Sequence, residues 1–159
     1  MYQRIILTSD GSLLARLAFP HARAIAAATG ATILLLAVTD TVDELLAEGR
    51  PTGWLDLGGD LSQDRATDAA EQQRALAETH LAALREELPG IASELHVVAG
   101  SAGPAIVEAA RTLDADLIVM ATHGRSGVAR AILGSVADHV ARHAACPVLL
   151  VRPSEGRSS

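Results

Sequence analysis

Lysine is absent from this 159-residue sequence, and all 13 basic side chains are arginines. The chain therefore lacks the lysine that nucleotide-hydrolysing phosphate loops carry. Cys146 is the single cysteine, which excludes an internal disulfide and suits a reducing compartment. No apolar run reaches the roughly 18 residues of a membrane span, and no signal peptide is visible at the N-terminus. These absences predict a soluble cytoplasmic protein.

Aromatic residues are also scarce: phenylalanine, tryptophan and tyrosine occur once each, although 49% of the residues are hydrophobic. A core of small aliphatic side chains suits helices packed on a sheet. The formal net charge of -6 disfavours a general nucleic-acid-binding surface. At this length we expect one domain, spanning residues 1–153.

Five short hydrophobic runs alternate with stretches of helical spacing. The runs are continuous rather than alternating, which indicates strands covered on both faces. They lie within residues 4–11, 31–40, 94–100, 115–124 and 147–153. The helical stretches lie within residues 12–30, 67–90, 103–115 and 134–146. The alternation predicts a doubly wound α/β fold, a five-stranded parallel sheet with right-handed crossovers and helices on both faces.

Two segments do not fit this pattern, residues 41–63 and the tail 154–159. The first is rich in glycine and holds the single tryptophan, and connections of this length are usually functional or mobile. We expect a short helix around Val42–Glu48 and then an irregular segment, which is either a flexible insertion or a lid. We expect the tail to be disordered.

A glycine-rich stretch, MATHGRSGVARAILGSV at residues 120–136, follows the fourth predicted strand. In an open parallel sheet, ligands bind beyond the carboxyl ends of the strands. Gly124 and Gly127 permit positive φ and let backbone N–H groups approach a ligand. Ser135 is the expected N-cap of the last helix, whose first N–H groups would form an anion site without any lysine. The alternative is an ordinary turn before a capped helix.

Asp10 ends the first predicted strand, in the stretch TSDGS, and is therefore expected beside this anion site. Its carboxylate could accept hydrogen bonds from a ribose or an adenine amine, or hold a divalent ion next to phosphates. The alternative is a capping role at the first helix, which Asp10 or Ser12 could fill.

Three blocks carry a resemblance to a known family: RIILTSDGS, ADLIVMATHGRSG and ILGSVADHVARHAACPVLLVRP. In this order and spacing, the chain resembles the ATP-binding branch of the universal stress protein family over nearly its whole length. The resemblance implies a Rossmann-like fold of the adenine nucleotide alpha hydrolase type, with strand order 3-2-1-4-5. It also implies a homodimer formed through the last strand.

The nucleotide-binding signature of that branch is Gly, two residues, Gly, nine residues, then Gly-Ser or Gly-Thr. Gly124, Gly134 and Ser135 match it, whereas Ala121 stands where the first glycine is expected. If the fourth strand continues through this position, the backbone is extended and an alanine is tolerated. If the position needs positive φ, alanine costs about 1 kcal/mol or more in strain.

The resemblance implies a set of nucleotide contacts in this sequence. Thr8, Ser9 and Asp10 would line the nucleoside, the Val38 backbone would contact adenine, Met120 and Ala121 would lie under the ribose, and Gly124, Gly134, Ser135, Val136 and Ala137 would hold the phosphates. The loop residues His123, Arg125, Gly127 and Arg130 are further candidates for phosphate contact or for simple solvent exposure.

The remaining histidines show no metal-ligand pattern. His139 and His143 are four residues apart but lack the glutamate of a zinc-protease helix, which indicates a surface pair. We expect no metal site from the protein alone; Mg2+ or Mn2+ would arrive with the nucleotide, near Asp10.

The last hydrophobic run, PVLLVRP, is expected to be an exposed sheet edge that pairs with a second copy. Val148 and Leu150 would alternate with Leu149 and Val151 across the two faces of the sheet. Cys146, just before this run, is expected to be a buried small hydrophobic residue.

The sequence thus predicts a regulatory protein that binds ATP, ADP or AMP and has other protein partners. We assign no catalytic residue, because hydrolysis needs a base and charge neutralisation that the sequence does not supply. The alternatives are a dimeric interaction module that works without nucleotide, which Ala121 favours, and a slow ATPase.

Overall fold

The computed structural model describes residues 1–48, 62–122 and 134–153. Five parallel strands form one sheet in the order β3-β2-β1-β4-β5. They are β1 (Arg4–Thr8), β2 (Thr32–Thr39), β3 (Ser93–Ala99), β4 (Leu117–Ala121) and β5 (Val148–Val151). The parallel sheet, expected from the hydrophobic runs, and the strand order, implied by the resemblance, are therefore confirmed.

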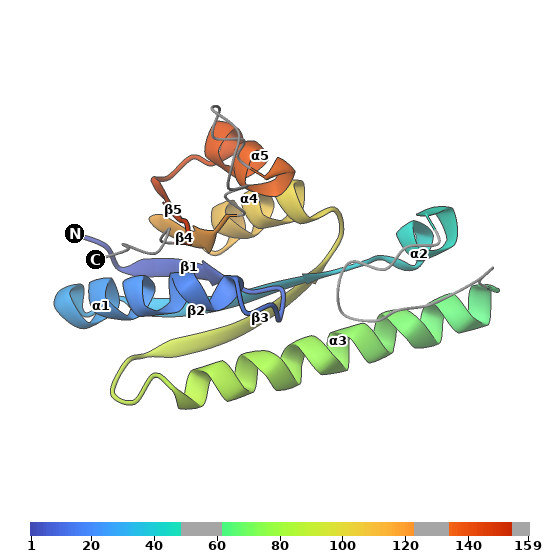
Figure 1. Cartoon of the computed structure of the whole chain (residues 1–159), viewed down its shortest axis with the longest axis horizontal. Helices are drawn as coiled ribbons and strands as arrows, with labels where there is room; N and C mark the ends of the chain where they lie inside the picture. Colours follow the sequence, from blue (N-terminus) through green and yellow to red (C-terminus); the bar gives the residue numbers. More distant parts are fainter. Residues whose placement is uncertain (49–61, 123–133, 154–159) are drawn as a thin grey trace, which may run out of the picture.

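The helices form a layer on each face of the sheet (Figure 1). They are η1 (Ala15–Ala18, a 3-10 turn), α1 (Phe19–Thr29), α2 (Val42–Glu48), α3 (Gln63–Glu86), α4 (Ala102–Thr112) and α5 (Ser135–His143). Helices α1 and α3 cover one face, and α4 and α5 cover the other. Helix α2 lies apart from the sheet, against the N-terminal part of α3 (Figure 1).

Neighbouring residues of each strand enter different cores, which explains the continuous hydrophobic runs. In β1, Ile5 and Leu7 pack toward α1 and α3, whereas Ile6 packs toward α4 and α5. All three side chains are at most 2% exposed. Burying each such side chain contributes about 1.5–3 kcal/mol, so both faces stabilise the sheet.

The edge strand β5 follows the same alternation. Leu149 and Val151 belong to the core on the α1 and α3 side, and Val148 and Leu150 belong to the opposite core. Among the described strands, β5 pairs only with β4. Three of its four residues are only half-buried.

The first predicted helix differs from the structure. The stretch at 12–30 forms two elements, the 3-10 turn η1 and helix α1, rather than one helix. Pro20 lies in the first turn of α1, where a residue without an N–H donor is tolerated, and it could not lie inside a longer helix. Gly30 ends α1 at a φ of 73°, as its position after the apolar pattern predicts.

The segment at 41–63 is described only at its ends. Helix α2 occupies the predicted range Val42–Glu48, and Gln63 belongs to α3 rather than to the irregular segment. Residues 49–61 and the tail 154–159 are not among the described residues, so the lid, the insertion and the disordered tail stay predictions.

Helices α4 and α5 approach closely at Gly103. A Cβ atom at this glycine would lie 2.9 Å from Cγ and 3.0 Å from Cβ of His139. The Cβ of His139 keeps its position in every rotamer, so a rotamer change alone cannot relieve the whole overlap. We therefore predict that Gly103→Ala lowers the free energy of unfolding by about 1–3 kcal/mol through overpacking, as measured by urea unfolding.

The double variant Gly103→Ala/His139→Ala serves as the control. Truncating His139 removes its Cγ, so we expect part of the loss to be recovered, with a coupling of about 0.5 kcal/mol or more. Strictly additive effects of the two substitutions would show that this contact does not limit the approach of the helices.

Candidate functional site

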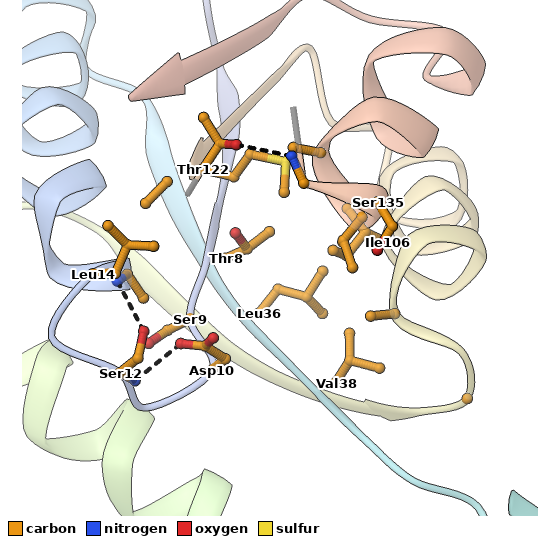
Figure 2. Close-up of a pocket in the computed structure, with 18 residues that line it drawn as sticks. Thr8, Ser9, Asp10, Ser12, Leu14, Leu36, Val38, Ile106, Thr122 and Ser135 are labelled. Atoms are coloured by element: carbon orange, nitrogen blue, oxygen red, sulfur yellow. Dashed lines mark hydrogen bonds between the residues drawn. The ribbon is translucent and has the colours of Figure 1, made fainter. Parts of the chain in front are cut away.

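A pocket of about 380 Å3 lies at the carboxyl end of the sheet. It is bordered by the ends of β1, β2 and β4, the segment after β1, and the first residues of α4 and α5 (Figure 2). Ten predicted contact residues line it: Thr8, Ser9, Asp10, Val38, Met120, Ala121, Gly134, Ser135, Val136 and Ala137. The other predicted contacts, His123, Gly124, Arg125, Gly127 and Arg130, fall in a part of the chain that the structure does not describe.

The start of α5 forms one wall of the pocket. The predicted capping residue is wrong by one position: Gly134 is the N-cap, and Ser135 is the first helical residue. The Gly134 N–H donates to the Thr122 hydroxyl oxygen at 3.4 Å, which ties the helix start to the end of β4. The first helical hydrogen bond runs from the Asp138 N–H to the Gly134 carbonyl. The N–H groups of residues 135–137 precede it, so they are available to a ligand.

The segment after β1 forms the opposite wall (Figure 2). Asp10 is exposed, and its Oδ1 accepts a hydrogen bond from the Ser12 N–H at 2.9 Å. The Ser12 hydroxyl oxygen accepts one from the Ala15 N–H at 3.1 Å. The N-cap of the 3-10 turn is Leu14, so the predicted capping role of Asp10 or Ser12 is wrong. Ser12 instead binds the first N–H of that turn, and Asp10 shapes the segment before it. The carboxylate of Asp10 remains at the pocket wall, where it is the one ionisable side chain among the described lining residues.

Ala121, the residue at the departure from the glycine signature, is the last residue of β4. It pairs with Val151 of β5, and its backbone is extended. Among the described residues other than glycine, positive φ occurs only at Asp114. The alanine therefore causes no backbone strain, and the site differs from the signature by one methyl group at the pocket wall.

An apolar wall separates the two polar sides. Leu36 and Val38 of β2 and Ile106 of α4 lie between the segment after β1 and the start of α5 (Figure 2). The sequence analysis identified Val38 but not the other two. Strand periodicity could have identified Leu36, because residues two apart share a face. Nothing in the sequence pattern places Ile106 there, because only the packing of α4 on the sheet does so.

Six further lining residues were also missed, namely Ser12 (considered only as a cap), Leu14, Ala15, Gly100, Ala102 and Thr122. Thr122 follows Met120 by two residues, so the same periodicity points to it. The others come from segments beside the strands, whose course the sequence pattern does not determine.

His80 of α3 is a polar neighbour of the site that sequence reasoning did not find. Its Nε2 lies 2.8 Å from the hydroxyl oxygen of Ser9. Burial, and next the charge of Arg16, lower the pKa of His80 from its ordinary value of 6.5, whereas Asp10 and Glu87 act in the opposite direction. Ser9 and His80 are separated by 71 positions in the sequence, and no pattern in the sequence signals this contact.

The described residues contain no group of three or more histidine, cysteine, aspartate or glutamate side chains that could hold a metal ion. The rings of His139 and His143 stack with centroids 4.2 Å apart on α5, and His143 is exposed.

Cys146 is half-buried rather than fully buried as expected, and its partial burial raises the pKa of its thiol. Within the described part of the chain, no helix is long and apolar enough to span a membrane.

Comparisons with known proteins agree with this arrangement. A sequence profile of the universal stress protein family matches residues 1–152. A universal stress protein of Methanocaldococcus jannaschii is 33% identical over 154 residues, which are 96% of this chain and 83% of that protein. One of Thermus aquaticus is 35% identical over 152 residues, 96% of this chain and 100% of that protein.

Similarity to a solved structure extends the agreement to three dimensions. A universal stress protein in complex with cAMP is 28% identical, with a TM-score of 0.64, and the match covers 94% of this chain and 97% of that one. The family profile and the two relatives each match almost the full length of the chain. The chain therefore belongs to the universal stress protein family.

Proposed function

We propose that this protein binds an adenine nucleotide in the pocket at the carboxyl end of the sheet and acts as a nucleotide-dependent regulatory protein. The observation that carries the proposal is the convergence of three features on one pocket: the start of α5, the carboxylate of Asp10 and the apolar wall. The similar solved structure with bound cAMP supports it.

Each feature suits one part of a nucleotide. Leu36, Val38 and Ile106 offer an apolar surface to the base. Asp10 accepts hydrogen bonds from ribose hydroxyl groups. The N–H groups at the start of α5 receive the phosphates, and the helix dipole contributes about 0.3–1 kcal/mol toward an anion. The described pocket walls need no basic side chain for this binding mode.

We propose ATP with Mg2+ or Mn2+ as the ligand, and ADP or AMP as its alternatives. Asp10 supplies the carboxylate oxygen that such ions prefer, and the phosphates and water would complete the coordination. One carboxylate and no described basic side chain at the pocket suit binding more than phosphoryl transfer, which requires a positioned water and charge neutralisation. We therefore expect little hydrolysis.

We further propose a cytoplasmic homodimer that pairs through β5. The strand lies at the sheet edge with half-buried hydrophobic residues, and Pro153 follows it closely. Occupancy of the pocket would change the surface that the dimer offers to other proteins. The methyl group of Ala121 is the feature that favours the alternative, an interaction module that works without nucleotide.

Substitution Ser135→Asp tests the phosphate end of the pocket. A carboxylate in the first turn of α5 interacts favourably with the helix dipole, so the fold should be retained or slightly stabilised, by about 0.3–1 kcal/mol. The same charge repels phosphate, so we expect AMP and ATP to bind at least about tenfold more weakly, which corresponds to about 1.4 kcal/mol. Binding of uncharged adenosine should change much less. Calorimetric titration measures all three affinities.

Gln63→Asp is the matched control, because Gln63 is the first residue of α3 and does not line the pocket. It should leave every nucleotide affinity unchanged. Equal affinity of Ser135→Asp and the unsubstituted protein for AMP would remove α5 from the binding site.

A thermal shift assay with ATP and Mg2+ tests binding itself, since ligand at about 100 times its Kd adds about 2.7 kcal/mol to the free energy of unfolding. No shift at millimolar ATP would favour the interaction module.

Substitution Val148→Lys tests the proposed dimer edge. A lysine on an edge strand opposes pairing with a second strand, so we expect the protein to sediment as a monomer, whereas the unsubstituted protein sediments at twice the chain mass. Far-ultraviolet circular dichroism checks that the fold is kept. A variant that folds and still sediments as a dimer would place the interface elsewhere.

A further inference from the structure

His80 connects helix α3 to the pocket wall that the segment after β1 forms. Its Nε2 lies 2.8 Å from the Ser9 hydroxyl oxygen, and Ser9 is 7% exposed. Ser9 follows the end of β1 and lines the pocket, whereas α3 packs on the sheet face opposite to α4 and α5. The histidine therefore contacts a pocket residue from the side of α3 and does not itself line the pocket.

Ser9 also forms a hydrogen bond within the segment after β1. Its hydroxyl oxygen accepts from the Gly11 N–H at 3.4 Å. Two further hydrogen bonds shape the same segment, since the Ser12 N–H donates to Asp10 and the Ser12 hydroxyl oxygen accepts from the Ala15 N–H (Figure 2). Ser9 is therefore joined both to His80 and to the segment that carries Asp10.

The direction of the His80–Ser9 hydrogen bond depends on the tautomer and the protonation of the ring. Neutral imidazole with its proton on Nδ1 accepts the Ser9 hydroxyl hydrogen at Nε2, whereas protonated imidazole donates from both ring nitrogens. Once His80 donates, the Ser9 oxygen accepts from both His80 and Gly11, and the serine hydrogen is free to point elsewhere. Because Ser9 lines the pocket, that hydrogen becomes a donor for a ligand oxygen.

We propose that His80 is a proton-linked positioning residue of the nucleotide site, whose protonation frees the Ser9 hydroxyl as a donor and strengthens the binding of anionic nucleotides. The inference rests on the proposed function and adds a pH dependence to that same pocket. The added positive charge of the ring acts in the same direction, because it attracts an anionic ligand.

Among the described residues, the charges of Arg16, Asp10 and Glu87 act on the ring. Arg16 of η1 opposes protonation of His80, and Asp10 and Glu87 favour it. Arg16 and Glu87 are themselves joined by an ion pair of 2.8 Å, which holds η1 against the end of α3. A phosphate bound at the start of α5 adds a negative charge across the pocket from these side chains, and its field should raise the pKa of His80.

The sign of the effect follows from linkage. The pKa of His80 lies below 6.5 in the free protein, and the charge of a bound anion should raise it. The additional affinity is therefore fully present below the pKa of the free protein, and it is lost as the pH rises through the pKa of the complex. Affinity for an anionic nucleotide should increase on acidification.

The test uses cAMP, because its phosphodiester does not titrate between about pH 5 and about pH 8. The phosphate of AMP has a pKa of about 6, so its own titration would add to the measured pH dependence. We expect the cAMP affinity of the full chain to rise at least about threefold from about pH 8 to about pH 5. His80→Gln, which keeps a donor and an acceptor but does not titrate, should give a flat profile. His21→Gln, at an exposed histidine of α1, should keep the profile of the unsubstituted protein.

Ser9→Ala provides a second variant in case His80→Gln folds poorly. It keeps the titrating ring and removes the hydroxyl, so most of the pH dependence should disappear. In the protein without nucleotide, the NMR signal of the Gly11 amide should titrate together with the His80 ring, and this coupling should be lost in Ser9→Ala.

Each outcome is decisive. Binding that is independent of pH, or a His80→Gln or Ser9→Ala variant with the original slope, would overturn this inference and leave the proposed function intact. A Gly11 amide that ignores the titration of His80 would also overturn it. Absence of cAMP binding at every pH would instead overturn the proposed function, and this inference with it.

Discussion

The reversal of strand order between β1 and β4 is the constraint on which the site depends. Strand β1 continues into η1 and α1 on one face of the sheet, and the chain after β4 reaches α5 on the other. The described elements that follow β1 and β4 therefore lie on opposite faces of the sheet, with a crevice between the two strand ends. The pocket lies at that crevice, with one wall formed by the segment after β1 and the other by the start of α5.

The described walls of the pocket present mainly backbone N–H groups to a negatively charged ligand. Among the described lining residues, Asp10 alone has an ionisable side chain, and the first N–H groups of α5 face the same space. Backbone donors at a helix start are held in place by the helix itself, so they lose little conformational freedom when an anion binds. This arrangement would allow the proposed nucleotide site to bind phosphates in a protein that has no lysine.

Helix α3 holds two of the strand ends that border the pocket. Gln73 is fully buried, donates to the Asp40 carboxylate at 3.0 Å, and accepts from the Asp40 N–H at 3.1 Å. Asp40 lies two residues beyond Val38, so this buried pair fixes the end of β2, as His80 and Ser9 fix the end of β1. A buried hydrogen-bonded carboxylate is costly to leave without its partner, which makes α3 a support of the site as well as of the core.

The sequence by itself determined the doubly wound sheet, most of the elements that build it and the two polar sides of the pocket, and the resemblance added most of the other predicted pocket residues. Continuous hydrophobic runs indicate strands covered on both faces. The carboxyl ends of parallel strands lie at one edge of the sheet, so the sequence pattern already predicted that Asp10 and Gly134 lie near each other. Pattern alone did not divide the stretch at 12–30 into η1 and α1 or assign the cap of α5 to Gly134, since helix ends depend on local hydrogen bonds such as that from Gly134 to Thr122. Only the tertiary structure brought Ile106 and His80 to the site. Their neighbours there are distant in sequence, and contacts between distant elements follow from how helices pack on the sheet, a property that no local spacing encodes.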